Sequence, residues 1–382
     1  MIRIAGENIV SSLGLSAEEN YRRVAAGESG LRLCEGLYGV SEPFMASLID
    51  DRALNEQFHR LCPAPPVRYT PLEQAAVYSA ACAIEAAGMD AAHPRVLFIL
   101  SSVKGNVALP ERPNEHAGTD RIHLWKTAQL VARHFGNRNT PVTVSNACIS
   151  GACALLTARR ELLSGRYDGV VAVGVDRLSK FIVSGFQSLK ALSPTPCRPF
   201  DADRCGLNLG EAAAAVALRR EDATEARPGS ILLADGAVRN DASHITAPSR
   251  TGEGLYRALR RIMQERRREE IAFINAHGTA TLYNDEMEAV ALHRAGLDAV
   301  HVNGLKASFG HTLGAAGILE SIISARALRN GTILKTQGFR QQGTIHPLHV
   351  SVENIPTKRQ YFIKTLSGFG GCNAALLFKK SD

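Results

Sequence analysis

The sequence lacks the features of a secreted, metal-stabilised or membrane-spanning chain. Its eight cysteines include no CxxC pair, and no group of His and Cys residues has the spacing of a zinc site. No stretch approaches the roughly 18 apolar residues that cross a bilayer. The N-terminus has neither the basic start nor the apolar core of a signal peptide. We therefore expect a reduced, cytoplasmic protein that has no disulfide framework and no metal site.

Aromatic residues are also scarce, at 6% of the chain with one tryptophan, whereas the net charge is +7. Excess positive charge favours an acidic partner, and nucleic acid is one candidate. The basic residues are dispersed, however, and few aromatic side chains are available to stack on bases. An acidic protein would satisfy the same charge, so we expect no interaction with nucleic acid or with a membrane.

Short, continuous apolar runs alternate with helical patterns along the 382 residues. Such runs are typical of strands that are covered on both faces, and the alternation predicts an α/β protein with layered sheets. We expect the proline-rich segment 62–71 to be a surface excursion, not a domain boundary. The expected strands are 95–100, 169–175, 212–218 and 271–276, and the expected helices are 71–87, 124–135, 152–164, 254–268 and 314–329.

Cys148 stands out in VTVSNACISGACALLTARREL (142–162), between a β-branched run and a helix that opens with small residues. A sulfur near a helix N-terminus meets the positive end of the helix dipole, which favours the reactive thiolate. Gly151 and Ala152 leave room for a substrate beside it. The pattern predicts a nucleophile, although an unpaired cysteine is also often a buried, inert residue.

Two histidines stand in glycine-containing loops of the second half. His277, in NAHGTATLYNDEMEA, ends a buried strand and enters a loop, which is a common place for a catalytic group. His311, in KASFGHTLGAAGILE, comes just before a helix of small residues and is flanked by Lys306 and Glu320. A lone histidine in such a loop is more often a core or capping residue, and His311 is also compatible with a place beside the N-cap of a closely packed helix.

The fourth motif is SGFGGCNAALLF (367–378), in which a turn of Gly and Phe precedes an apolar strand. Such a turn can aim a backbone N–H at a reacting oxygen. It is also compatible with a tight hairpin that has no catalytic role.

Together, and in this order, the four motifs resemble those of the elongating β-ketoacyl-[acyl-carrier-protein] synthases, which are condensing enzymes of the thiolase superfamily. The resemblance covers nearly the whole chain. It includes the opening IAGENIVSSLG and the segments FQSLKALSP, CRPFDADRCGLNLGEAAAAV and DASHITAPSRTGEG.

The resemblance implies an α/β fold of the thiolase-like type, a five-layer αβαβα sandwich built from two similar halves and usually dimeric. The halves would be residues 1–220, with the nucleophilic cysteine, and residues 221–382, with the two histidines. The internal duplication itself is not visible in the sequence.

The matching motif positions also imply roles in the site. Cys148 would be the nucleophile, and His277 and His311 would be the paired histidines. Phe369 would be the aromatic gate, and its N–H would form an oxyanion hole with that of Cys148. Three further pairs match the supporting ion pair, the acidic residues behind the first histidine and the threonines that hold pantetheine: Lys306 and Glu320, Asp285 and Glu288, and Thr279 and Thr281.

The implied reaction is a decarboxylative Claisen condensation of malonyl-carrier protein with an acyl group on Cys148. No metal or redox cofactor is needed, because the substrates travel on the phosphopantetheine arm of the carrier protein. The implied partners are an acidic acyl-carrier protein and a second subunit, in a homodimer or a heterodimer. Arg68, Arg198 and Arg204 lie in segments that resemble the carrier-facing side, whereas 266–268 is expected to be a solvated helix end.

Three departures from the family pattern leave the triad intact. Cys205 replaces an acidic residue, alanines replace a Gly-Ala-Gly sequence, and Cys372 follows GFGG where Thr, Ser or His is usual. They suit a specialised pathway with a polyene- or polyketide-like product, while the resemblance as a whole implies chain elongation of the fatty-acid or the polyene- or polyketide-like kind. Two alternatives stay open: a thiolase that uses Cys372 as a second cysteine, and a non-catalytic or partner-dependent chain-length subunit. The motif of His311 favours the synthases, and the presence of all three triad residues favours an active subunit.

Overall fold

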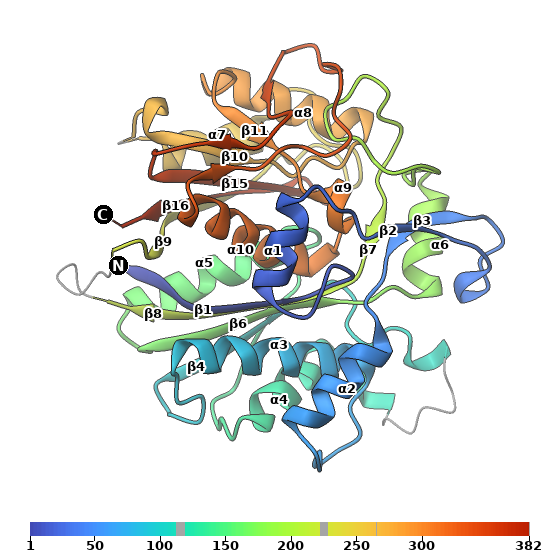
Figure 1. The fold of residues 1–382 in the computed structure, drawn as a ribbon, viewed down its shortest axis with the longest axis vertical. Helices are drawn as coiled ribbons and strands as arrows, with labels where there is room; N and C mark the ends of the chain where they lie inside the picture. Colours follow the sequence, from blue (N-terminus) through green and yellow to red (C-terminus); the bar gives the residue numbers. More distant parts are fainter. Residues whose placement is uncertain (112–118, 222–227, 265, 382) are drawn as a thin grey trace.

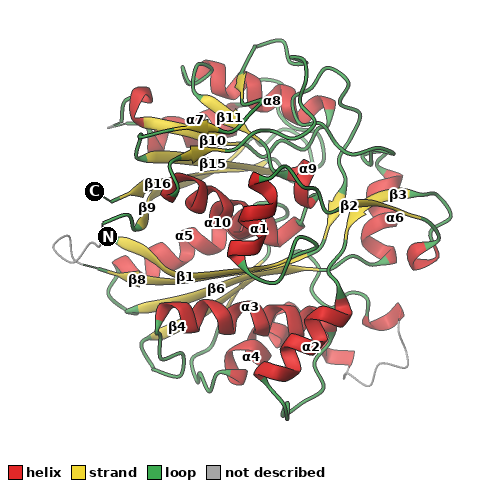
Figure 2. Cartoon of the chain, viewed as in Figure 1, coloured by secondary structure: helices red, strands yellow, loops and turns green. Residues whose placement is uncertain are grey.

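The computed structural model describes residues 1–111, 119–221, 228–264 and 266–381, which stack in five layers. In Figure 1, outer helices, a sheet, central helices, a second sheet and further outer helices follow one another along the long axis. Figure 2 gives the same view by secondary structure, with the two sheets enclosing the central helices. The thiolase-like sandwich expected from the sequence is confirmed.

Two groups of five strands share one topology. Numbered in chain order within each half, the strands lie side by side as third, second, fourth, fifth and first. This repeated order is the internal duplication that the sequence does not display. The first half uses β5 (Val142–Val144), β4 (Val96–Ser101), β6 (Gly169–Asp176), β8 (Ala212–Arg220) and β1 (Ile2–Val10), and the second uses β11 (His301–Asn303), β10 (Ile271–Asn275), β15 (Tyr361–Gly368), β16 (Cys372–Lys380) and β9 (Ile231–Asn240).

The two groups meet where β1 pairs with β9 at Arg3 and Leu232. The exact division of the chain into 1–220 and 221–382 stays a prediction. The remaining strands extend the outer edge or form two small sheets: β13 (His349–Val350), then β2 (Leu31–Cys34), β3 (Phe44–Ser47) and β7 (Leu209–Gly210), and finally β12 (Thr332–Ile333) with β14 (Ile355–Pro356).

The distribution of apolar residues in each helix matches the number of sides on which that helix is buried. The outer helix α7 (Glu253–Ile262) buries Leu255, Ala258 and Leu259 on one face, and its arginines are exposed on the other. The central helix α10 (Ala316–Arg329) is buried on nearly all sides, as a helix that is apolar all round must be. The others are α1 (Ala17–Ala25) and α5 (Ser150–Leu163) in the central layer, α2 (Asp51–Leu61), α3 (Pro71–Ala87) and α4 (Leu124–His134) on the first sheet, α8 (Leu282–Arg294) beside α7, and α6 (Lys180–Ser188) and α9 (Lys306–Phe309).

The expected strands and helices are present, with one boundary clearly wrong. The helix predicted at 254–268 ends at Ile262, because the buried positions of its apolar face stop there, and residue 265 lies outside the described residues. The proline-rich segment is a largely exposed loop as far as Arg68, as predicted, and Tyr69 and Thr70 are buried just before Pro71 begins α3. Within the described residues, no helix has both the length and the apolar character needed to span a membrane.

The central helices α5 and α10 cross closely at two glycines near their starts. A Cβ on Gly151 would lie 2.9 Å from a backbone nitrogen of α10, and one on Gly317 would lie 2.5 Å from a backbone nitrogen of α5. Only glycine permits this approach, because atoms so close would clash. The crossing brings the residues just before the two helices, Cys148 and His311, to the same place.

Replacing Gly317 with Ala should lower the free energy of unfolding by about 1–3 kcal/mol, because the added methyl overpacks the helix crossing. Gly185→Ala in α6 is the matched control, since a Cβ there meets nothing within 4 Å. A helical Gly→Ala change normally stabilises by about 0.5–1 kcal/mol. Urea unfolding of both variants measures the two effects, and a Gly317→Ala protein as stable as the wild type would contradict the close crossing.

Candidate active site

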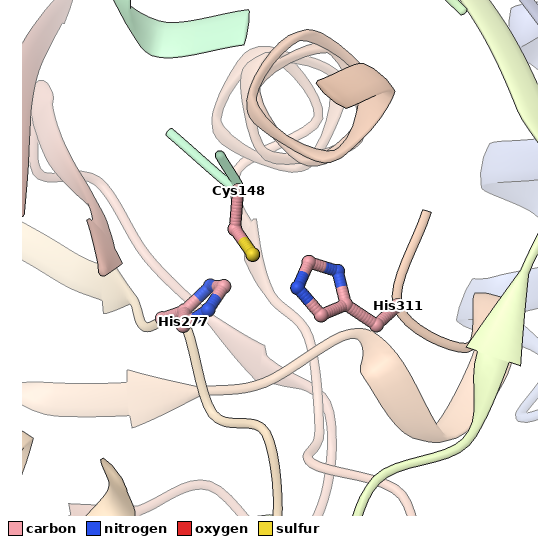
Figure 3. A group of neighbouring side chains, drawn as sticks. All are labelled: Cys148, His277 and His311. Atoms are coloured by element: carbon pink, nitrogen blue, oxygen red, sulfur yellow. The ribbon is translucent and has the colours of Figure 1, made fainter. Parts of the chain in front are cut away.

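Cys148, His277 and His311 converge in one buried group. The Cys148 sulfur and a ring nitrogen of each histidine all lie within 4.8 Å of one another. The imidazole rings are 5.1 Å apart and nearly perpendicular, at 84°. Figure 3 shows the sulfur directed toward the gap between the two rings. The structure therefore brings together the three residues that the sequence motifs predicted to act together.

A strained turn positions Cys148 between β5 and α5. Ala147 has a positive φ of 45°, a conformation that residues other than glycine rarely adopt. The hydroxyl of Ser150 donates to the Ala147 carbonyl at 2.6 Å and accepts from the Asn146 N–H at 2.7 Å. These two hydrogen bonds hold the turn and present the sulfur to the histidines.

The resting sulfur is a thiol. Burial raises the pKa of Cys148 to about 11, although the Lys306 ammonium and the N–H of Phe369 oppose this rise. The prediction that the helix start would favour a thiolate is wrong for the resting site. The helix begins only at Ser150, two residues after Cys148, and the loss of hydration on burial is the largest influence on the pKa of the thiol.

Hydrogen bonds fix the proton position on both histidines. Nδ1 of His311 accepts the N–H of Leu313 at 3.2 Å, and its Nε2 is buried without a partner among the described residues. Nδ1 of His277 accepts from the Lys306 ammonium at 3.2 Å. Burial and the nearby ammonium of Lys306 hold the pKa of both imidazoles well below the usual value. Each ring is therefore neutral, with its proton on Nε2.

This pattern argues against a metal ion at the three residues. A histidine that binds a metal through one nitrogen usually donates the N–H of the other to a carbonyl or carboxylate. Here Nδ1 of His277 and of His311 both accept hydrogen bonds. Binding through Nε2 would remove the only proton of each ring, so the group suits hydrogen-bond donation better than metal ligation.

The predicted ion pair lies directly behind His277. Lys306 and Glu320 are buried and 2.8 Å apart, and the Lys306 ammonium also donates to the His277 carbonyl at 2.6 Å. Lys306 and a second lysine, Lys364, hold the pKa of Glu320 below its usual value despite burial. Lys364 was not predicted, and the only signal for it was a single charge inside the apolar strand YFIKTLSG.

The two predicted acidic residues hold the loop that follows β10. Glu288 accepts the N–H groups of His277 at 2.8 Å and of Gly278 at 2.7 Å. Asp285 accepts the N–H of Phe200 at 2.7 Å, and burial raises the pKa of this carboxyl to about 7. Glu288 thus fixes the backbone of His277, and Asp285 ties the same loop to the first half.

A further acidic residue, Asp176, holds the loop of His311 and was missed in the sequence. Its carboxylate accepts the N–H of Gly314 and the hydroxyl of Ser102, both at 2.7 Å. Asp176 is the last residue of the apolar strand GVVAVGVD, and this terminal charge was the available signal.

The predicted gate, Phe369, lies beside the sulfur. Its backbone N–H is directed at Cys148, and its ring stacks on Phe186 of α6 with the centroids 6.0 Å apart. The residue is 38% exposed, so Phe369 stands between the buried group and solvent.

A cavity of about 390 Å³ leads to the three residues. Thr279 and Thr281, predicted to hold pantetheine, line it with their hydroxyl oxygens 2.9 Å apart. Cys205 lines it too, whereas Cys372 is not among its described lining residues, so the thiolase alternative gains no support. The lining is otherwise mainly apolar and includes Phe186, Leu189, Ala191, Leu207, Pro248, Leu282 and Met287.

The arginines predicted to face a carrier protein differ in exposure. Arg68 is exposed and Arg198 is half-buried. Arg204 is buried and donates to the carbonyls of Asp201 at 3.0 Å and Gly343 at 2.6 Å. The prediction is wrong for Arg204, because a buried guanidinium that is held by backbone carbonyls cannot meet a partner.

The fold and the Cys-His-His group together define a thiolase-like condensing-enzyme architecture. Residues 1–223 match the family model for the N-terminal domain of β-ketoacyl synthases, and residues 231–340 match the model for the C-terminal domain. The chain belongs to the β-ketoacyl synthase family.

Relatives with known names agree with this membership. Nodulation protein E of Rhizobium meliloti is 32% identical over 260 residues, which cover 65% of this chain and 64% of that protein. 3-Oxoacyl-[acyl-carrier-protein] synthase 2 of Rhizobium meliloti (strain 1021) is 33% identical over 255 residues, covering 62% of this chain and 60% of that protein. The chain thus matches less than two thirds of the length of these relatives.

Solved structures extend the similarity to the whole chain. One described as the ishigamide ketosynthase/chain length factor is 27% identical, with a TM-score of 0.86, and covers 100% of this chain and 99% of that one. The ketosynthase ApeO in complex with its chain length factor ApeC, from Xenorhabdus doucetiae, has the same TM-score of 0.86 at 23% identity and shows the fold alone.

We expect alkylation of Cys148 by iodoacetamide to accelerate steadily from about pH 7 to about pH 10. The reason is that the thiolate fraction keeps rising until the pH reaches the pKa of about 11. An ordinary thiol, with a pKa of about 8.5, would level off near pH 9. Peptide mass spectrometry separates Cys148 from the exposed Cys205 in one digest. A Cys148 rate that is independent of pH between about 7 and 9 would indicate a resting thiolate and contradict the assignment.

Proposed function

We propose that the protein is a β-ketoacyl-[acyl-carrier-protein] synthase that condenses malonyl-carrier protein with an acyl group held on Cys148. The observation that carries this proposal is the convergence of one thiol and two neutral Nε2–H donors in a buried cavity. Such a group offers both a covalent acceptor and a site for a developing negative charge. Membership of the β-ketoacyl synthase family supports it.

In the first step, the Cys148 sulfur loses its proton and attacks the thioester carbonyl of an acyl-carrier protein. The backbone N–H groups of Cys148 and Phe369 are the proposed oxyanion hole for the tetrahedral intermediate. The carbon–sulfur bond to the pantetheine arm breaks, and the released thiolate takes up a proton. The acyl group is then bound to Cys148.

In the second step, malonyl-carrier protein enters the same cavity. The Nε2–H groups of His277 and His311 donate hydrogen bonds to its thioester oxygen. The bond between the α-carbon and the carboxylate breaks, CO2 leaves, and its electron pair forms an enolate on that oxygen. Two neutral donors suit this step, because they stabilise the new charge without needing to lose a proton.

In the third step, the enolate carbon attacks the acyl carbonyl on Cys148. A carbon–carbon bond forms, the bond to sulfur breaks, and the Cys148 thiolate that leaves takes up one proton from solvent, which is the proton that the overall condensation consumes. The product is a β-ketoacyl chain on the carrier protein. Thr279 and Thr281 are proposed to hold the pantetheine arm in the cavity.

The proposed partner is an acidic acyl-carrier protein, and no dissociable cofactor is required. A homodimer or a heterodimer with a homologous subunit is proposed in addition, and a similar solved structure is described as a ketosynthase/chain length factor. The acyl chain belongs to fatty-acid or polyene- or polyketide-like elongation. The complete Cys-His-His group favours the catalytic role over that of a non-catalytic chain-length subunit.

Incubation with octanoyl-carrier protein and 14C-carboxyl-labelled malonyl-carrier protein tests this function. Wild type should acquire an octanoyl mass increment on Cys148, release labelled CO2 and form a C10 β-ketoacyl product. Cys148→Ala should lose the increment and the product, whereas Cys205→Ala, the control, should keep the increment. An octanoyl increment that survives in Cys148→Ala would contradict the assignment of the nucleophile.

In the same assay, substitution of the histidines should affect a different partial reaction from substitution of Cys148. His277→Ala and His311→Ala should each lower CO2 release by roughly 10²-fold or more, the usual scale for such donors. Loading of octanoate on Cys148 should fall much less, because the first step uses backbone donors. Unchanged CO2 release in both variants would rule out their proposed role.

Docking of the carrier protein should depend on surface charge. Arg68→Glu should raise the Michaelis constant for carrier-bound substrate with little change in turnover, and higher salt should raise it in the wild type. Arg198→Glu should act in the same direction. Arg267→Glu is the control, since that exposed arginine follows the outer helix α7. A Michaelis constant that is unchanged by salt, by Arg68→Glu and by Arg198→Glu would exclude electrostatic docking.

A further inference from the structure

Lys364 is a buried charge that the three proposed steps do not use. It lies in the middle of β15, with a fully buried side chain. Its ammonium lies 2.5 Å from the Oε2 oxygen of Glu320 on α10. Because Lys306 takes the other oxygen at 2.8 Å, one carboxylate is shared by two ammonium groups. A buried lysine requires such compensation, and its presence in an apolar strand calls for a reason beyond packing.

The two ammonium groups hold three consecutive carbonyls at the end of β10. Lys364 donates to the carbonyls of Asn275 at 3.3 Å and Ala276 at 3.1 Å. Lys306 donates to the next carbonyl, that of His277, at 2.6 Å. The backbone that carries the imidazole is therefore clamped by two cations that Glu320 bridges.

We propose that Lys364 is a positioning residue for His277, which clamps the preceding carbonyls and keeps both imidazoles in the neutral, Nε2–H form. This inference rests on the proposed function. In this proposal, Lys364 contacts neither the sulfur nor the substrate oxygen. It acts through the position and the protonation state of the His277 imidazole.

The electrostatics point in the same direction. Burial has the largest effect on the pKa of His277 and of His311, and the Lys306 and Lys364 ammonium groups lower both further. Removing the positive charge of Lys364 should therefore raise both imidazole pKa values toward the usual range. Lys364 itself is charged below about pH 8, because burial lowers its pKa to about 8.

The charged and titratable groups around this cluster come from every neighbouring element. Lys364 is faced by Glu320 of α10, Lys306 of α9 and Glu288 of α8. The sulfur of Cys148 is influenced by Lys306 and by Asp176 of β6, with no contribution from Lys364 among the leading causes. A change at Lys364 should thus affect the histidines and leave acyl loading nearly unchanged.

Two variants separate the clamp from the charge. Lys364→Met removes both the charge and the donor, whereas Lys364→Gln keeps an N–H donor for the carbonyls. Lys379→Met, at a half-buried lysine on β16, is the matched control. Release of CO2 from malonyl-carrier protein should fall by roughly tenfold in Lys364→Met and less in Lys364→Gln. Octanoyl loading of Cys148 should stay within about twofold of the wild type in all three.

The pH profile gives a readout that a purely structural role would not move. The acid limb of CO2 release should shift to higher pH in both Lys364 variants and not in Lys379→Met. In 15N-histidine NMR, His277 and His311, assigned by His→Asn substitution, should begin to protonate at higher pH in the same two variants. Folded Lys364 variants with unchanged histidine titration would overturn the inference.

A wild-type measurement covers the case in which neither variant folds. In the wild type, 15N-histidine NMR should show His277 and His311 still neutral at pH values well below the usual histidine range, because burial and the Lys306 and Lys364 ammonium groups lower both pKa values. An ordinary histidine titration near pH 6.5 in the wild type would contradict the role of Lys364. If the wild type released no CO2 while the histidine titrations shifted as expected in the Lys364 variants, the proposed function would be rejected. The positioning role of Lys364 would still stand.

Discussion

The close crossing of the two central helices is the constraint on which the site depends. In each half, the third strand leads into a central helix, so Cys148 before α5 and His311 before α10 occupy corresponding places. The duplicated topology alone would leave them on separate halves. Gly151 and Gly317 let the helix backbones approach, and this approach joins the two positions. A larger side chain at either glycine would separate the sulfur from the imidazole, whatever residues followed.

The same burial keeps the three central groups, Cys148, His277 and His311, uncharged. Loss of hydration raises the pKa of the Cys148 thiol and lowers that of both imidazoles, so all three are neutral at rest. Among the described residues, the carboxylates of Glu288 and Asp176 form no hydrogen bond with a histidine ring. Glu288 and Asp176 instead accept backbone N–H groups and hold the loops. In the proposed reaction, negative charge would develop on the substrate oxygen, where N–H donors are already in place. The side chains would therefore need little reorganisation to stabilise it.

Local patterns predicted an α/β protein with layered sheets, and the resemblance of four short motifs to a known family implied the thiolase-like fold and the grouping of Cys148, His277 and His311. Apolar runs mark buried strands, and Cys148, His277 and His311 each stand in a short motif. Lys364 and Asp176 were missed because each is a single charged residue in a mainly apolar strand, and its partners come from distant segments. The prediction that Arg204 would face a carrier protein was wrong because tertiary contacts bury this arginine. Its carbonyl partners, on Asp201 and Gly343, cannot be identified from the local sequence.

The geometry also bears on the order of the proposed steps. The backbone N–H groups of Cys148 and Phe369 lie at the sulfur itself, whereas the Nε2–H groups of His277 and His311 face the space beside it. An acyl group on Cys148 would place its oxygen at the first pair and leave the second pair free. The two oxyanions of the reaction would therefore use different donors. In the proposed reaction, one buried cavity could then serve acyl transfer and decarboxylation in succession. Neither histidine side chain would have to move between the two steps, because each oxyanion has its own pair of donors.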